Sequence, residues 1–130
     1  MNRWMILPAM ALVACTSSAE FQSTALSRAD RDLADELKGL TPGAPVTCIS
    51  NTATNGPQVI DTDTILYRAG RTVYRNELPA ECRNLEPGNT LIIELHGSQV
   101  CENDRFRVLE PGQSIPGPYC RLGKFTPYKK

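Results

Sequence analysis

The sequence is poor in the residues from which most metal and acid–base sites are built. Its 130 residues include one histidine, His96, and a lone histidine cannot form the usual set of zinc ligands. It contains no C-x-x-C pair, no H-E-x-x-H pattern, no G-x-S-x-G motif and no glycine-rich phosphate loop. These absences argue against a zinc site, a serine nucleophile of that kind and a phosphate-binding loop, and we expect no metal and no cofactor.

An excess of charge of either sign is also missing. Lysine and arginine total 14, aspartate and glutamate total 14, and the sequence pI is about 6.6. A nucleic-acid-binding domain usually carries a basic patch or stripe, so we expect no nucleic acid partner. Hydrophobic residues at 41% and charged residues at 22% are typical of an ordinary globular chain, and the length is that of one domain.

No hydrophobic run is long enough to cross a bilayer, which takes about twenty residues. The longest run extends from Trp4 to Ala14 and follows a single charged residue, Arg3. A short apolar stretch behind a basic residue at the N-terminus is typical of a signal peptide. The sequence therefore predicts export, with residues 1–14 removed.

The end of this run, LVAC at 12–15, resembles the lipobox of bacterial lipoproteins. Leu12 stands three positions before Cys15, and two small residues separate them. We expect the Cys15 thiol to carry a diacylglycerol and its new amino group a further acyl chain such as palmitate, which together anchor the protein in a membrane. No aspartate follows Cys15, which favours the outer membrane, facing the periplasm. The alternative is an ordinary secretory signal that delivers a periplasmic or secreted protein.

Two segments follow the predicted lipid anchor. Residues 15–26 are small and polar and predict a flexible tether. Residues 27–130 predict the single folded domain, which opens with a short amphipathic helix at 27–39. Leu33 and Leu37 repeat there at helical spacing.

The rest of the domain has the pattern of a β protein. We expect two hairpins, one around Gly70-Arg71 with Tyr67 facing Tyr74, and a second around Gly97. The fold class we expect is mainly β: one short N-terminal helix followed by about six short antiparallel strands, which form a small sheet or partly open barrel. The segments with strand character are 45–50, 58–61, 64–69, 72–76, 90–96, 98–101, 105–110 and 119–125.

The chain has five cysteines, and lipidation of Cys15 would leave an even set. Cys48, Cys82, Cys101 and Cys120 lack the spacing of a zinc site, so we expect disulfides, as an oxidising compartment allows. The sequence does not choose among the pairings. We expect Cys82–Cys101, which closes a local loop, and Cys48–Cys120, which joins the first strand to the last.

Three motifs resemble a family of small, uncharacterised exported bacterial proteins. They are VYRNELPAEC at 73–82, CENDRF at 101–106 and CRLGKFTP at 120–127, and the likeness covers residues 45–127. The resemblance implies an envelope location and a four-cysteine framework. It implies no activity, substrate or catalytic residue.

Four residues are candidates for binding. Arg68, Tyr74 and Arg75 lie on the first predicted hairpin, and arginine with tyrosine can bind carboxylates, sugars or a protein partner. Asp104 belongs to the second motif of the resemblance, where it can act in a site or cap a loop.

The sequence thus predicts a non-enzymatic binding or structural module of the cell envelope. Its expected partners are the membrane, through the lipid, and an envelope protein or cell-wall component. One alternative is a small cell-wall hydrolase that uses Asp104 or Glu94 with His96, since paired carboxylates cleave glycosidic bonds. Another is an inhibitor of an exogenous enzyme, because a rigid disulfide-bonded domain binds at low entropic cost.

Overall fold

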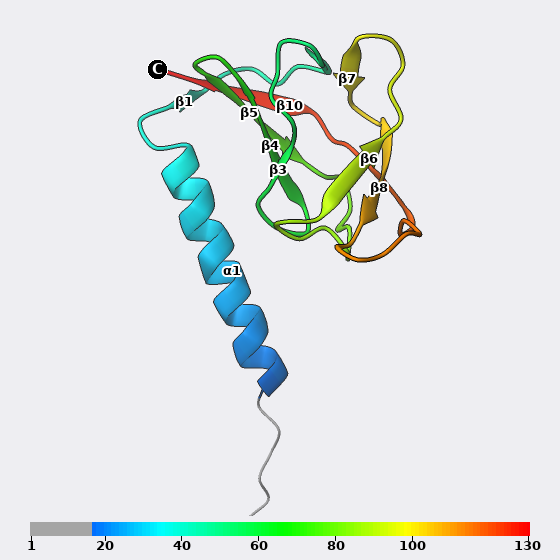
Figure 1. Ribbon diagram of the computed structural model, residues 1–130. Coiled ribbons are helices and arrows are strands. Elements are labelled where there is room, and N and C mark those ends of the chain that lie inside the picture. The colour runs from blue at the N-terminus through cyan, green and yellow to red at the C-terminus, as the bar shows by residue number, and fades with distance from the viewer. Residues whose placement is uncertain (1–16) are drawn as a thin grey trace, which may run out of the picture.

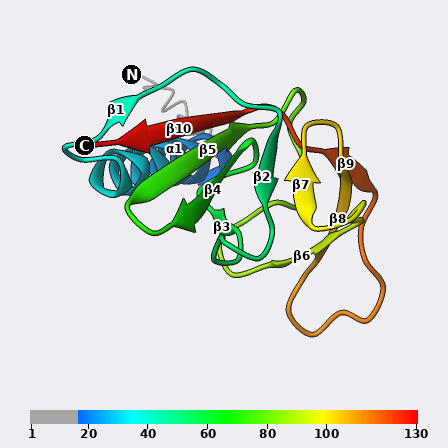
Figure 2. The same ribbon diagram turned by 90° about the horizontal axis from the view of Figure 1, so that it is seen from above.

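The computed structural model describes residues 17–130, and these form three layers around a central sheet (Figures 1 and 2). The predicted signal peptide at 1–14 and the predicted lipidation site Cys15 lie outside the described residues. The central five-stranded sheet has the order β1 (Thr41–Pro42), β10 (Phe125–Lys129), β5 (Thr72–Glu77), β4 (Thr64–Ala69) and β3 (Gln58–Val59). Helix α1 (Ser17–Glu36) packs on one face of it, and two smaller sheets cover the other. The smaller sheets are β2 (Cys48–Ser50) with β7 (Gln99–Cys101), and β6 (Thr90–Ile93) with β8 (Arg105–Leu109) and β9 (Tyr119–Arg121).

The expected fold class is confirmed. Every strand pair is antiparallel, and the strands of residues 17–130 form open sheets without a closed barrel. The hairpin around Gly70-Arg71 is also confirmed, with Tyr67 opposite Tyr74. Gly70 has a φ of 59°, as the first central residue of a type II′ turn requires, and glycine adopts this conformation without steric cost.

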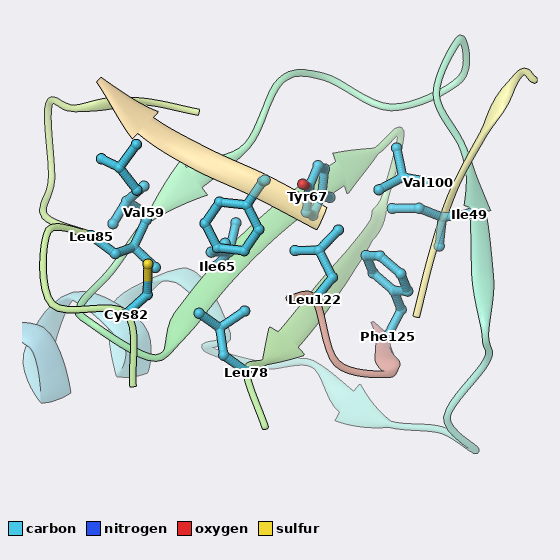
Figure 3. Close-up of a cluster of buried hydrophobic side chains, with 12 residues drawn as sticks. Ile49, Val59, Ile65, Tyr67, Leu78, Cys82, Leu85, Val100, Leu122 and Phe125 are labelled. Carbon is cyan, nitrogen blue, oxygen red and sulfur yellow. The ribbon is translucent and has the colours of Figure 1, made fainter. Parts of the chain in front are cut away.

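Strand β4 is buried on both sides because it lies in the middle layer. Ile65 and Tyr67 point into the main core, which fills the space between the central sheet and the two smaller sheets (Figure 3). Leu66 points the other way and joins Val73 in a second cluster under α1. Because both faces of β4 are covered, consecutive residues are apolar, and the strand lacks the usual alternation of apolar and polar residues. The fully buried side chains of the main core include Phe106, Phe125, Leu85 and Leu122.

A buried amide joins β5 to the segment between β9 and β10. The Asn76 side chain is fully buried and donates from Nδ2 to the Gly123 carbonyl oxygen at 2.8 Å. The Gly123 N–H donates in turn to Asn76 Oδ1, also at 2.8 Å. Both polar groups of the asparagine are therefore satisfied inside the protein, as burial requires.

Helix α1 begins at Ser17 rather than at Ser27, so the segment expected to be a flexible tether is helical. The segment contains no glycine or proline to interrupt a helix, although its side chains give no apolar stripe. Its first half is not packed on the domain, and Phe21 is 78% exposed. A role of this segment as a spacer to a membrane stays a prediction. Across residues 17–130, no helix combines the length and the apolar character needed to span a membrane.

The second half of α1 docks on the central sheet. Ala29 is buried against Leu66 and Val73, and Leu33 and Leu37 pack beside it. Glu36 adds an ion pair and a hydrogen bond, which come from Arg68 of β4 and from Gln58 of β3. The helix then stops before Gly39, whose φ of 73° is typical of a helix end, as the sequence predicts.

The predicted hairpin around Gly97 is wrong. Strand β6 pairs with β8, and β7 pairs with β2, so the only pairing across Gly97 is a single bridge from His96 to Gln99. The reason is burial: Val100 of β7 lies opposite Ile49 of β2, and both enter the main core. A local turn does not outweigh such contacts between distant strands.

The predicted disulfide pairing is also wrong. The bonds are Cys48–Cys101 and Cys82–Cys120, with Cα–Cα distances of 4.0 and 6.0 Å. Cys48 and Cys101 stand directly opposite each other in β2 and β7. The expected pairing favoured closure of a short loop, whereas strand pairing between distant segments decides which thiols meet.

The predicted last strand at 119–125 is divided. Strand β9 ends at Arg121, Leu122 and Gly123 are buried in the connection, and the separate strand β10 runs beside β5. The sequence prediction ended the last strand at residue 125 and gave none over 126–129. Pro127 lacks an N–H and is disfavoured inside a sheet, yet β10 includes it. Its carbonyl oxygen accepts a bond from Gly43 N–H at 2.7 Å, which helps to hold β10.

Candidate interaction surface

The three-stranded sheet presents one side to the core and the other to solvent. Leu91 and Ile93 of β6 pack inward, as do Phe106 and Val108 of β8. The intervening residues point outward, and register places Ile92, Arg107 and Tyr119 in one row across the three strands. We call the solvent side of this sheet the outer face. It consists of Ile92, Glu94, Arg105, Arg107, Tyr119 and Arg121.

Tyr119 is the centre of the outer face. Its side chain is 53% exposed, and the guanidinium carbons of Arg105 and Arg107 lie 4.7 and 5.2 Å from the centre of its ring. Arginine over an aromatic ring gains about 0.5–1 kcal/mol at an exposed site. The three side chains therefore support one another in an ordered cluster.

Arg107 is held further by the loop between β8 and β9. Its Nε donates to the Gly117 carbonyl oxygen at 2.7 Å, and a terminal nitrogen donates to the Pro116 carbonyl oxygen at 2.8 Å. Both acceptors are neutral, so the positive charge of Arg107 keeps no carboxylate partner among the described residues. Ile115, next to Pro116 in the chain, is 80% exposed.

Glu94 is the one acidic residue of the outer face. Arg105 donates to its Oε2 from Nε at 3.2 Å and from a terminal nitrogen at 2.8 Å. This hydrogen bond, together with one from the Tyr119 hydroxyl, lowers the pKa of Glu94. Glu94 is therefore ionised and paired with Arg105, so it carries no proton that it could donate as a general acid.

Arg121 completes the basic character of the outer face. It lies opposite Arg105 in β9 and donates to the Asn103 carbonyl oxygen at 3.3 Å. Beside it, a hollow of about 260 Å³ opens between β9 and the segment 79–81. The arginines of the outer face outnumber its single glutamate, so the surface is positive.

The candidate binding residues from the sequence do not form one site. Arg68 and Arg75 point toward the helix side of the central sheet, where Arg68 pairs with Glu36 and Arg75 with Glu77. Tyr74 points to the opposite side and packs against the main core. The register of the hairpin explains the separation, because successive residues of a strand face opposite ways.

Asp104 lies in the turn between β7 and β8. Its Oδ2 accepts a hydrogen bond from the Cys101 backbone N–H at 2.7 Å, and its own N–H donates to the Cys101 carbonyl oxygen at 3.1 Å. Asn103, in the same turn, is the one non-glycine residue of 17–130 with a positive φ, 68°. The carboxylate thus closes a tight turn beside a disulfide.

Replacement of Asp104 by alanine is expected to destabilise the domain by about 1.5–3 kcal/mol, because it removes a hydrogen bond to a charged acceptor. Asp104→Asn keeps an acceptor oxygen and should lose less. Urea unfolding of both variants measures the difference. Equal stability of Asp104→Ala and the parent protein would contradict this structural role.

Two further carboxylates, those of Asp61 and Asp63, also lie in a turn. Asp61 Oδ1 accepts a bond from Asp63 N–H at 3.1 Å between β3 and β4. Burial raises the pKa of Asp61, whereas the hydrogen bond shared with Asp61 lowers the pKa of Asp63. Aspartates bonded to the backbone two residues on are typical turn residues. Across 17–130, no three His, Cys, Asp or Glu side chains gather closely enough to hold a metal ion.

Sequence reading missed the outer face, although its signal is present. The stretch 105–108 alternates charged and apolar residues, which in a strand places Arg105 and Arg107 on one side and Phe106 on the other. Tyr119 and Arg121 follow the same rule in β9. What the sequence could not supply is the pairing that brings these strands together. Comparison with family models, with curated proteins and with solved structures finds no match to this chain.

Proposed function

We propose that the protein is an exported, lipid-anchored binding module of the bacterial cell envelope rather than an enzyme. The outer face is the observation that carries the proposal. Arginine and tyrosine are among the residues that contribute most to binding at protein interfaces, and here an exposed Tyr119 lies against a half-buried Arg107 that is fixed in place.

The disulfides support an envelope location. Cys48, Cys82, Cys101 and Cys120 are all paired, and such bonds persist where thiols oxidise. The remaining cysteine, Cys15, is the one that the lipobox likeness predicts to be lipidated. The two observations agree without depending on each other.

The residues of the hydrolase alternative have other roles. Asp104 bonds the turn at Cys101, and Glu94 pairs with Arg105. His96 is exposed beside Gly97. These contacts favour a binding module over the hydrolase.

Lipidation of Cys15 is tested by mass spectrometry of the protein isolated from membranes. The expected mass is that of residues 15–130 with acyl chains on residue 15. A Cys15→Ser variant should lose this lipid and leave the membrane fraction. Persistence of Cys15→Ser in the membrane would contradict lipid anchoring.

The binding role is tested by crosslinking in living cells, with photoreactive residues placed in turn at exposed positions on each side of the domain. Capture of one defined envelope protein supports the proposal. Capture of an exogenous enzyme would favour the inhibitor instead. Absence of crosslinks from every position, at normal expression, would count against any binding role.

A further inference from the structure

We propose that the outer face binds an extended acidic segment of a partner protein. This inference rests on the proposed function, because it names the surface and the chemistry of the partner of the same binding module. It is carried by three observations: unpaired positive charge, fixed side chains, and apolar groups beside them.

The positive charge of the outer face is suited to binding carboxylates. Arg105 pairs with Glu94, but Arg107 and Arg121 donate to neutral carbonyl oxygens and form no ion pair with any residue of 17–130. Guanidinium groups bind carboxylates through parallel hydrogen bonds, and this geometry gives specificity as well as attraction. An acidic segment would supply the missing partners.

The side chains are already in place before any partner arrives. Arg107 is tied to the loop at Pro116 and Gly117, and its guanidinium lies over the Tyr119 ring. Binding therefore immobilises few additional rotamers, which lowers the entropic cost of association. Charged side chains that only keep a protein soluble do not need to be held by hydrogen bonds and ring packing in this way.

Apolar groups beside the arginines favour a protein over other anionic partners. Ile92 is 43% exposed in the same row as Arg107 and Tyr119, and Ile115 is 80% exposed on the neighbouring loop. A segment with alternating acidic and apolar side chains matches both kinds of group. A membrane would meet the arginines with its headgroups and the isoleucines with its acyl chains, so binding to vesicles is the alternative that the test separates.

The shape of the surface suits an extended chain. Strand β9 is at the edge of its sheet, with β8 as its only neighbouring strand among the described residues. The hollow of about 260 Å³ runs between this edge and Pro79, Ala80 and Glu81, so the apolar side chains of the partner would enter it while its carboxylates face the arginines. Helix α1 lies on the other side of the domain from β9 (Figure 2). Extended peptides commonly bind beside such free strand edges.

The test measures binding of two fluorescent peptides to the disulfide-bonded protein purified from the envelope. One peptide alternates glutamate with leucine, and the other alternates lysine with leucine. Fluorescence anisotropy should show binding of the glutamate peptide only, and this binding should weaken as salt is added. Arg105→Glu with Arg121→Glu should reduce its affinity by about tenfold or more, since both charges are reversed.

The matched control reverses one exposed arginine in each of two other places, Arg31→Glu with Arg71→Glu. These residues lie on α1 and at the β4–β5 turn. The control should bind the glutamate peptide like the parent protein. Tyr119→Ala, which changes no charge, should also weaken binding. All variants should contain the Cys48–Cys101 and Cys82–Cys120 bonds of the parent protein, as peptide mapping by mass spectrometry verifies.

Three results would overturn the inference. The first is equal binding of the glutamate and lysine peptides, and the second is an equal loss of binding in the Arg31→Glu, Arg71→Glu control. The third is binding to phosphatidylglycerol vesicles with the same dependence on Arg105 and Arg121, which would assign the face to a membrane. Crosslinks in cells from positions on another side of the domain would then support the proposed binding function but place it on a different surface.

Discussion

Replacement of Gly123 by alanine is expected to destabilise the domain by more than about 4 kcal/mol, a loss that few single substitutions reach. A methyl group at this position would overlap the Glu77 carbonyl oxygen of β5 and would lie 3.0 Å from the Glu77 carbonyl carbon. Both atoms belong to the backbone, so no side-chain rotation relieves the overlap. The hydrogen bonds between Gly123 and Asn76 would break when the strands separate. Urea unfolding followed by circular dichroism measures the loss.

Gly56→Ala is the matched control for this prediction. No atom lies within 4 Å of a methyl group at Gly56, and its φ is not positive. Alanine there should leave stability unchanged or raise it by about 0.4–1 kcal/mol, because it restricts the unfolded chain. If Gly123→Ala unfolds at the same urea concentration as this control, the close approach of Gly123 to β5 is wrong.

Removal of the disulfides is expected to have the other large effect. Cys48–Cys101 and Cys82–Cys120 join residues 53 and 38 positions apart. In the chain-entropy model each bond then contributes about 4 kcal/mol by restricting the unfolded state. Because a domain is stable by about 5–15 kcal/mol in total, loss of both bonds should leave it largely unfolded. Cys48→Ser with Cys101→Ser, and Cys82→Ser with Cys120→Ser, test each bond alone.

The order of reduction gives a second readout of the same bonds. Cys82 is 3% exposed, whereas Cys48 and Cys101 are both partly exposed. A gentle reductant should therefore open Cys48–Cys101 first, and alkylation with mass spectrometry identifies the thiols that it frees. Recovery of a Cys82–Cys101 peptide from the untreated protein would contradict the observed pairing.

The parts of the fold that sequence predicts are those with local causes. Gly70 and the strand formers around it determine the β4–β5 hairpin and its register. Gly39 likewise marks the end of α1. In both places a single backbone conformation restricts the chain within a few residues, and the sequence shows it directly.

The parts that sequence misses depend on distant partners. Cys101 lies opposite Cys48 because β7 joins β2, and nothing near Gly97 signals that pairing. The prediction ended the last strand at residue 125, whereas β10 continues to Lys129 because it pairs with β5 and because Pro127 accepts a hydrogen bond from Gly43. Contacts of this kind are chosen by burial across the whole domain and not by local preference.

The candidate binding residues divide in the same way, into features with local causes and features that depend on distant strands. Arg68 and Arg75 were chosen because they stand near tyrosines in the sequence, yet alternation turns them toward α1 and away from Tyr74. Arg107 and Tyr119 are twelve residues apart and meet only because β8 pairs with β9. Sequence can show which residue types are suited to binding, but strand pairing decides which of them share a surface.

The first half of α1 extends beyond the part of the helix that packs on the central sheet. An α-helix rises 1.5 Å per residue, so the turns before Ala29 extend about 18 Å from the packed part. The ion pair of Glu36 with Arg68 lies at the opposite, packed end and joins the helix to β4. The distance between Ser17 and the central sheet is therefore a property of the fold.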